Sequence, residues 1–168
     1  MIYGRKISTC SCTILVFCCK ITEKGGIVAM RVTCCGHGEL SNPSSIHDIL
    51  NDIFQELIQE GAVEFYLGGY GEFDRIAASV LNALKQSFPH INVILVIPYP
   101  NQKYDLMLYD SSVYPPLENV PARFAIPRRN EWMIDQADIV VSYIRHPFGG
   151  AFNATAYAKR RKKRIVSL

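Results

Sequence analysis

The sequence predicts a single α/β domain in which helices cover both faces of a mostly parallel sheet. Short apolar or β-branched segments alternate with amphipathic helical segments from Met30 onward, which is typical of parallel strands joined by crossover helices. Glycine-rich turns follow several expected strands, at the edge where ligands bind in such sheets. The length of 168 residues suits one domain.

The first half of the domain is expected to contain three strands and two helices. Met30–Cys35 is short and apolar, and a glycine-rich turn ends it. Ile46–Glu60 carries apolar residues at helical spacing, and Ser44 or Ser45 is expected to cap it. The next expected elements are a strand over Ala62–Leu67, a helix over Phe73–Phe88 and a nearly all-apolar strand over Ile91–Ile97.

The second half begins with the longest irregular stretch, residues 98–121, which is rich in Pro, Tyr and Asn. A loop of this length is usually functional or locally structured. The expected elements after it are a helix over Arg128–Ala137, a strand over Asp138–Ile144, a helix from Gly149-Gly150 to Lys163 and a strand over Arg164–Leu168. The predicted architecture is therefore a Rossmann-like three-layer sandwich with a mostly parallel five-stranded sheet.

Residues 1–29 are interpreted as separate from the domain of residues 30–168. Residues 10–19 are apolar but too short to span a bilayer, which takes roughly 20 residues. Lys24-Gly25-Gly26 is what a purine-rich ribosome-binding site encodes when it is translated, and three codons separate it from Met30. Residues 1–29 are thus predicted to be a translated leader ahead of a mis-assigned start, and the alternative is a floppy amino-terminal extension.

Charge and cysteine content favour a cytoplasmic protein without a membrane partner. Residues 30–168 hold 14 basic and 14 acidic residues, although one basic run extends from Lys159 to Arg164. This run is interpreted either as a solvated helix end or as a nucleic-acid site. No CxxC pair occurs, so we expect reduced thiols, no metal site and no required cofactor.

Three glycine-rich turns at one edge of the expected sheet predict a ligand site. Glycine lets a backbone approach a ligand closely, and free N–H groups at the following helix favour an anion. Turn geometry alone is the alternative explanation. The candidate ligand-binding residues in these turns are Gly36, His37, Gly38, Gly68, Gly69, Gly71, Gly149 and Gly150.

Polar residues beside the turns extend this candidate site. Glu72 and Asp74 could hydrogen-bond ribose hydroxyls or base edges, or could simply complement a helix dipole. His37 could bind phosphate, act in acid–base chemistry or form ordinary hydrogen bonds. Arg129 and the following Asn130 lie where a helix is expected to begin, a position where cations oppose the dipole, so a phosphate contact is predicted for Arg129.

The ordered motifs TCCGHGEL, FYLGGYGEFDRIAASVLNALK, IPRRNEWMIDQADIVVSYI and FGGAFNATAYAKRRKKRIVSL resemble the SLOG superfamily. This superfamily includes the DprA/Smf DNA-processing proteins and the LOG phosphoribohydrolases, and small uncharacterised bacterial and phage members are the nearest in pattern. The resemblance covers residues 30–168. It implies a Rossmann-like fold, a nucleotide or ADP-ribose-like ligand and a homo-oligomer.

The chain departs from the LOG enzymes at their signature PGGxGTxxE. The corresponding stretch begins at Phe148 and retains the glycine pair, but Asn153 replaces the Thr and Thr155 is taken to replace the catalytic Glu. The resemblance matches the LOG arginine to Arg129. A neutral Thr155 cannot stabilise a cationic sugar centre, so LOG-type hydrolysis is not expected unless Glu72 or Asp74 supplies a carboxylate.

The predicted function is a nucleotide-binding or nucleotide-derivative-binding domain that acts as a sensor or non-catalytic binder. The first alternative is an N-glycosidase or phosphoribohydrolase-like enzyme with Glu72 or Asp74 as its catalytic candidates. The second alternative is a DprA-like nucleic-acid binder. The tyrosines of the long loop could stack on a base or pack against one another; these are Tyr99, Tyr104, Tyr109 and Tyr114.

Overall fold

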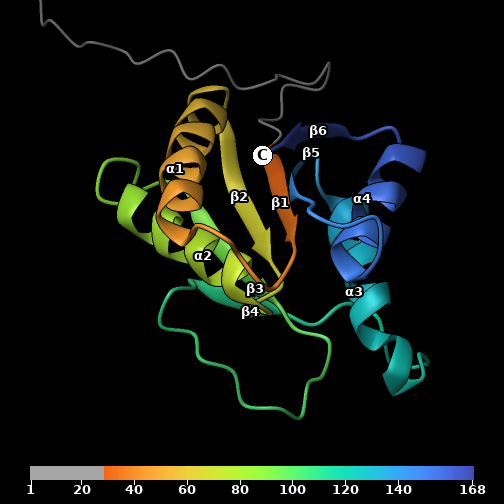
Figure 1. The fold of residues 1–168 in the computed structure, drawn as a ribbon. Coiled ribbons are helices and arrows are strands. Elements are labelled where there is room, and N and C mark those ends of the chain that lie inside the picture. The colour runs from red at the N-terminus through yellow and green to blue at the C-terminus, as the bar shows by residue number, and fades with distance from the viewer. Residues whose placement is uncertain (1–28) are drawn as a thin grey trace, which may run out of the picture.

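The computed structural model describes residues 29–168, which form an α/β sandwich around a six-stranded parallel sheet (Figure 1). The strands are β1 (Met30–Gly36), β2 (Ala62–Leu67), β3 (Asn92–Val96), β4 (Ser111–Val113), β5 (Ile139–Tyr143) and β6 (Arg164–Ser167). The helices are α1 (Pro43–Gln59), α2 (Glu72–Leu84), α3 (Ala122–Gln136) and α4 (Gly150–Arg160). The predicted leader lies outside the described residues, so it stays a prediction.

The strand order β4-β3-β2-β1-β5-β6 places the start of the domain in the middle of the sheet. The chain adds β2, β3 and β4 on one side of β1, and then crosses to add β5 and β6 on the other. Val32 of β1 accordingly lies opposite Phe65 of β2 and Ile139 of β5. This reversal of direction beside β1 is a topological switch point, where a crevice opens beyond the carboxyl ends of the strands.

Two helical layers enclose the sheet because its strands are apolar on both faces. Helices α1 and α2 cover one face and α3 and α4 cover the other (Figure 1). On the α1–α2 face, Phe54 packs edge to face on Phe65 with ring centroids 5.5 Å apart. On the α4 face, Val140 packs with the small residues Ala154 and Ala158, which bring the helix close to the strand. No helix among residues 29–168 has the length and apolar character needed to cross a membrane.

The sheet has a sixth strand that the sequence pattern did not predict. Strand β4 lies within the irregular stretch 98–121 and pairs in parallel with β3. Its three residues are too few and too polar for a period-two pattern to be recognised. Asp110 positions the strand, because its carboxylate accepts a hydrogen bond from the Val93 N–H at 2.8 Å and forms an ion pair with Lys85.

Two helix starts also differ from the expectation. Asn42 caps α1, with its side chain accepting from the Ser45 N–H at 3.3 Å, and Pro43 is the first helical residue, so the prediction of a serine cap was wrong. Helix α3 begins at Ala122 and contains Pro127, whereas the helix was expected to begin at Arg128. Arg129 therefore lies inside α3 and not at its start, and the dipole argument for a phosphate there was wrong.

Candidate functional site

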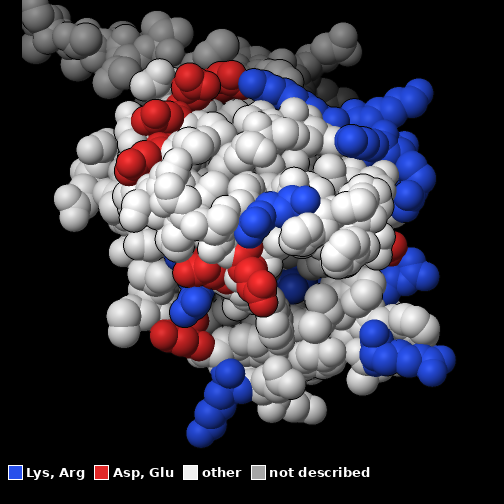
Figure 2. All heavy atoms as spheres, in the orientation of Figure 1, with Lys and Arg blue, Asp and Glu red and all other residues white. Residues whose placement is uncertain are grey.

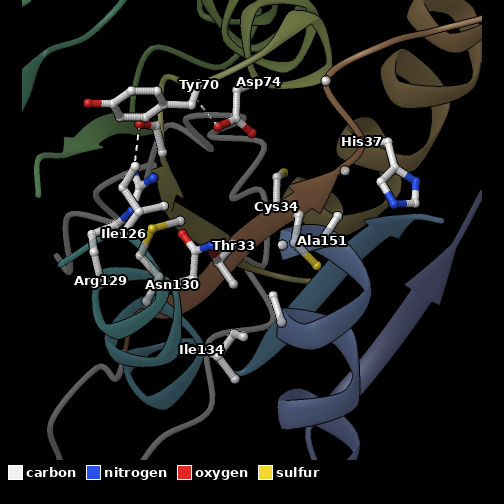
Figure 3. Close-up of a pocket in the computed structure, with 17 residues that line it drawn as sticks. Thr33, Cys34, His37, Tyr70, Asp74, Ile126, Arg129, Asn130, Ile134 and Ala151 are labelled. Carbon is white, nitrogen blue, oxygen red and sulfur yellow. Dashed lines mark hydrogen bonds between the residues drawn. The ribbon is translucent and has the colours of Figure 1, made fainter. Parts of the chain in front are cut away.

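A cavity of about 220 Å³ lies beyond the carboxyl ends of β1 and β2, at the switch point of the sheet (Figure 3). Its walls are the turns after these two strands, the side of α3 and the first turn of α4. Eight predicted site residues line it: Gly36, His37, Gly38, Gly68, Asp74, Arg129, Asn130 and Gly150. The strand-end turns thus meet as the parallel sheet requires.

Six predicted site residues do not line this cavity. Asn153 lines a smaller cavity of about 90 Å³, which shares Asn130 and Gly150 with the main one. Thr155 lines a separate cavity beside β6. The remaining four residues lie in the surrounding turns: Gly69, Gly71, Glu72 and Gly149.

The Arg129 side chain ties together the carboxyl ends of β2 and β3. It is only 2% exposed, and its Nη1 donates to the Gly68 carbonyl at 2.6 Å and to the Val96 carbonyl at 2.8 Å. Its Nε has no hydrogen-bond partner within the described residues. Burial lowers the pKa of Arg129, and the carboxyl of Asp74 opposes this effect. Arg129 is thus a buried cation with a structural role at the cavity wall.

Close packing accounts for some of the predicted glycines. A Cβ atom on Gly68 would lie 2.5 Å from Nη1 of Arg129, and one on Gly36 would lie 2.3 Å from the Phe73 ring. Gly150 differs, because among residues 29–168 no atom outside its own helix turn lies within 4 Å of the position of its Cβ. Turn and packing geometry therefore explains Gly36 and Gly68, but it does not explain Gly150.

Asp74 is a buried carboxylate at the start of α2, 8% exposed. Its Oδ2 accepts a hydrogen bond from the Tyr70 N–H at 3.2 Å, which holds the Gly68–Tyr70 turn against the helix. Burial raises the pKa of Asp74 to about 6, although Arg129 and the turn's N–H groups oppose the shift. The helix-dipole interpretation is incomplete, because this side chain also faces the cavity (Figure 3).

We predict a pH-dependent contribution of Asp74 to stability. Because burial raises its pKa from 3.8 to about 6, the fold favours the protonated carboxyl. The stability due to this group is fully present below about pH 4 and is lost as the pH rises through about 6. In Asp74→Asn the side chain cannot ionise but can still accept from Tyr70. We therefore expect the free energy of unfolding of this variant, relative to the wild type, to rise by about 3 kcal/mol as the pH increases from about 4 to about 7.

Urea unfolding of both proteins at each pH measures this difference. Glu72→Gln, which replaces a neighbouring acid outside the cavity, is the matched control. A stability difference between wild type and Asp74→Asn that stayed constant with pH would contradict the prediction.

His37 connects the turn after β1 with the turn before α4. Its Nδ1 accepts from the Arg145 N–H at 2.9 Å, and its Nε2 lies 3.2 Å from the Phe148 carbonyl oxygen. A backbone N–H can only donate and a carbonyl can only accept, so this geometry fits the neutral tautomer that carries its proton on Nε2. With both nitrogens engaged, ordinary hydrogen bonding describes His37 better than acid–base chemistry.

The first turn of α4 forms the part of the cavity wall best suited to an anion. Gly149 precedes the helix with φ +94°, no side chain of the described residues caps it, and its first turn contains no acid. Gly150 and Ala151 line the cavity. The first N–H groups of a helix have no partner within the helix and carry partial positive charge.

Sequence reasoning missed several lining residues. Tyr70 belongs to the glycine-rich turn Gly68–Gly71 and could have been recognised there. The apolar lining residues of α3 and α4 carry no such signal, because only the packing of the two helices turns them toward the cavity; they are Ile126, Met133, Ile134, Ala151 and Ala154.

The two cysteines of β1 are both protonated at neutral pH. Burial raises the pKa of Cys34 well above its ordinary value and that of Cys35 to about 11. The Cys35 Sγ lies 3.3 Å from the Thr155 hydroxyl, while Cys35 also lines the cavity. Buried, protonated thiols of this kind are poor nucleophiles.

The glutamate of the LOG signature corresponds to Ala156 and not to Thr155. A residue-by-residue count of PGGxGTxxE from Phe148 places its glutamate at Ala156, one position after Thr155. Thr155 is 7% exposed and hydrogen-bonds Cys35, and both Thr155 and Ala156 line the separate cavity beside β6. Neither position carries a carboxylate, so the expected absence of the LOG glutamate does not depend on this shift.

The basic run Lys159–Arg164 lies around the end of α4 and the start of β6, where basic side chains gather at one corner of the molecule (Figure 2). Three of its six residues have hydrogen-bond or ion-pair partners, and a fourth, Arg160, lies over the Tyr157 ring. The Lys163 ammonium donates to the Asp135 and Ala137 carbonyls at 3.0 and 2.7 Å, at the end of α3. Arg161 forms an ion pair with Asp135, and Arg164 forms one with Glu60. This arrangement favours the solvated-helix-end interpretation, because the run lies at the opposite edge of the sheet from the cavity.

The fold and this cavity together define a Rossmann-like α/β protein with a candidate ligand site at its switch point. No family model matches the sequence. The chain is 28% identical over 148 residues to YoqJ, an uncharacterised protein derived from the SPbeta prophage of Bacillus subtilis strain 168, covering 72% of this chain and 85% of YoqJ.

Solved structures of proteins with low sequence identity share the fold. DNA processing protein A from Helicobacter pylori, whose structure describes single-stranded DNA binding, superposes with a TM-score of 0.59 at 17% identity, covering 82% of this chain and 64% of that chain. The Moco carrier protein from Chlamydomonas reinhardtii gives a TM-score of 0.54 at 16% identity, covering 84% and 76% of the two chains. These are SLOG-type folds, so the resemblance predicted from the motifs is confirmed for the fold.

Proposed function

We propose that this chain binds a nucleotide or nucleotide derivative, such as an ADP-ribose-like molecule, with a phosphate at the first turn of α4. The observation that carries the proposal is Gly150, which lines the cavity and has, in the described part of the chain, no neighbour outside its own helix turn within 4 Å of its Cβ position. Uncapped N–H groups at that turn suit a phosphate. No cofactor is needed for this function.

The electrostatics of the cavity support an anionic ligand with a polar end. Arg129 places a permanent positive charge in the wall between α3 and the strand ends. Asp74 and Asn130 add an acceptor and an amide group to the same wall. A ligand that carries both phosphate and ribose hydroxyls fits this distribution, because it has an anion for the α4 turn and donors for Asp74.

Gly150→Asp tests the proposal. An acidic residue in the first turn complements the helix dipole, so the fold should be at least as stable as in the wild type. The same carboxylate would repel a bound phosphate, and we expect affinity for a nucleotide to fall by roughly tenfold or more. Binding is measured by calorimetry and thermal shift with AMP, ADP-ribose and cyclic AMP, using the full chain. A probe at 100 times its Kd should stabilise the wild type by about 2.7 kcal/mol.

Gly150→Asn is the matched control, because it adds a side chain of the same size without the charge. We expect it to bind more tightly than Gly150→Asp for every probe. Equal binding by the two variants would show that phosphate does not lie at α4. The absence of any thermal shift across all three probes for the wild type would contradict nucleotide binding itself.

A second candidate function, N-glycosidic cleavage, is favoured by the ionisation of Asp74. A carboxyl with a pKa near 6 in a cavity can exchange a proton at neutral pH, as general acids and bases do. Incubation with nucleotides and chromatography for released base tests this function. Turnover that is lost in Asp74→Asn but kept in Glu72→Gln would support it, and intact nucleotide after long incubation would leave the binding function alone.

A further inference from the structure

We infer that Tyr70 provides the stacking surface for the base of the ligand. The base lies at the mouth of the cavity, and the site binds it without selecting among the different bases. This inference rests on the proposed nucleotide function. It adds the part of the ligand that lies outside the phosphate site, and a specificity-determining residue for it.

The size of the cavity indicates that only part of a nucleotide is enclosed. Its volume is about 220 Å³, whereas sites that bury a drug-sized ligand span roughly 300–1,000 Å³. At about 30 Å³ for each water molecule, it holds roughly seven waters. If the phosphate lies at α4 and the sugar fills the interior, the base must extend to the mouth.

Tyr70 lies at the side of the cavity away from α4. It lines the cavity, yet 41% of its surface is exposed. Figure 3 shows Tyr70 beside Asp74 and Arg129, with Ala151 and His37 across the cavity. A ligand that extends from the α4 turn toward this side therefore reaches the Tyr70 ring.

The ring is held in place before any ligand binds. Asp74 fixes the backbone of Tyr70 through its 3.2 Å hydrogen bond, and the Arg129 Cζ lies 5.3 Å from the ring centroid. Arg129 is itself fixed by two backbone carbonyls. A positioned aromatic ring loses little conformational freedom on binding, so stacking on it contributes more to affinity.

Stacking on the Tyr70 ring does not by itself read a base edge, and the Tyr104 hydroxyl near this ring is already engaged with the Tyr99 carbonyl. Tyr109 approaches the turn, with its hydroxyl 3.6 Å from the Cβ position of Gly69. The same loop segment carries Leu106 and Met107, which are 44% and 82% exposed. Apolar contact and stacking suit any base, whereas discrimination needs donors and acceptors at the base edge.

Binding of ribose 5-phosphate and the four mononucleotides AMP, GMP, CMP and UMP to the full chain tests the inference. We expect each mononucleotide to bind about 5- to 150-fold more tightly than ribose 5-phosphate, the range of one stacked base, with the four affinities close together. In Tyr70→Ala the mononucleotides should fall to the affinity of ribose 5-phosphate, while Tyr70→Phe should keep their advantage.

Phe124→Ala is the matched control. Phe124 is also an exposed aromatic residue, 46% exposed with an arginine 4.8 Å from its ring, but it does not line the cavity. We expect this variant to bind every probe as the wild type does.

The outcomes separate the two proposals. Mononucleotides that keep their advantage in Tyr70→Ala, or one base that binds far more tightly than the other three, would overturn the stacking inference while ribose 5-phosphate binding still supports the phosphate site. Failure of ribose 5-phosphate and of all four mononucleotides to bind would overturn the proposed function as well.

Discussion

Arg129→Met is expected to lower the free energy of unfolding by about 3–5 kcal/mol, the usual loss when one member of a buried charged network is removed. The variant leaves the Gly68 and Val96 carbonyls without their donor and removes the positive charge that faces the Asp74 carboxylate. Methionine fills much of the volume but cannot donate. Urea unfolding at neutral pH measures the loss.

Arg128→Met is the matched control, because it changes the neighbouring residue of the same helix. The Arg128 side chain is 61% exposed and forms an ion pair with Glu131 three residues later, so its replacement should cost less than about 0.5 kcal/mol. The double variant Asp74→Asn/Arg129→Met should be more stable than the sum of the two single effects on the free energy of unfolding predicts. The reason is that the Asp74 carboxylate, which Arg129→Met alone leaves uncompensated, is absent from the double variant. Similar stabilities of Arg129→Met and Arg128→Met would show that Arg129 is not a structural residue.

Gly71→Ala is expected to destabilise the fold by about 2–5 kcal/mol. Gly71 has φ +88°, and its Cβ would lie 2.8 Å from the Cα of Gly38. A non-glycine residue in this backbone region costs about 1–3 kcal/mol, and overpacking adds a similar amount. The neighbour is backbone of the turn after β1, so it cannot rotate away as a side chain could. Urea unfolding measures the effect.

Gly150→Ala makes the same chemical change where neither obstacle exists. No described atom outside its own helix turn lies within 4 Å of its Cβ position, and its φ is not positive. Alanine there should be neutral or should stabilise α4 by up to about 1 kcal/mol. Equal destabilisation at the two glycines would contradict the distinction between packed and open glycines on which the phosphate site depends.

Arg129 and Gly71 both act on the turns that surround the cavity. Arg129 and Gly71 hold the turns after β1 and β2 in contact with each other and with β3, while Gly150 leaves the α4 turn open. The turns at the cavity are therefore preorganised for a ligand and need not be ordered when it binds.

The alternation of apolar strands and amphipathic helices was enough to predict the fold class. Parallel strands direct their carboxyl ends to one edge, so the glycine-rich turns after β1, β2 and β5 were expected to meet, and residues from each of them line the cavity. This inference needs only the order of the elements along the chain. The same reasoning could not find β4, because the three residues Ser-Ser-Val become a strand only by pairing with the edge of β3.

The local sequence determined that glycines, an arginine and two acids would lie near the end of the sheet, because short-range pattern and chain order place them there. It could not determine their roles. Arg129 lies inside α3 and bonds Gly68, which is 61 residues away, and Asp74 faces the cavity while Glu72 does not. These distinctions depend on the packing of α3 against the strand ends and on the direction in which each helix turns its side chains. Such long-range contacts decide which groups are buried, paired or open to a ligand, and no local pattern encodes them.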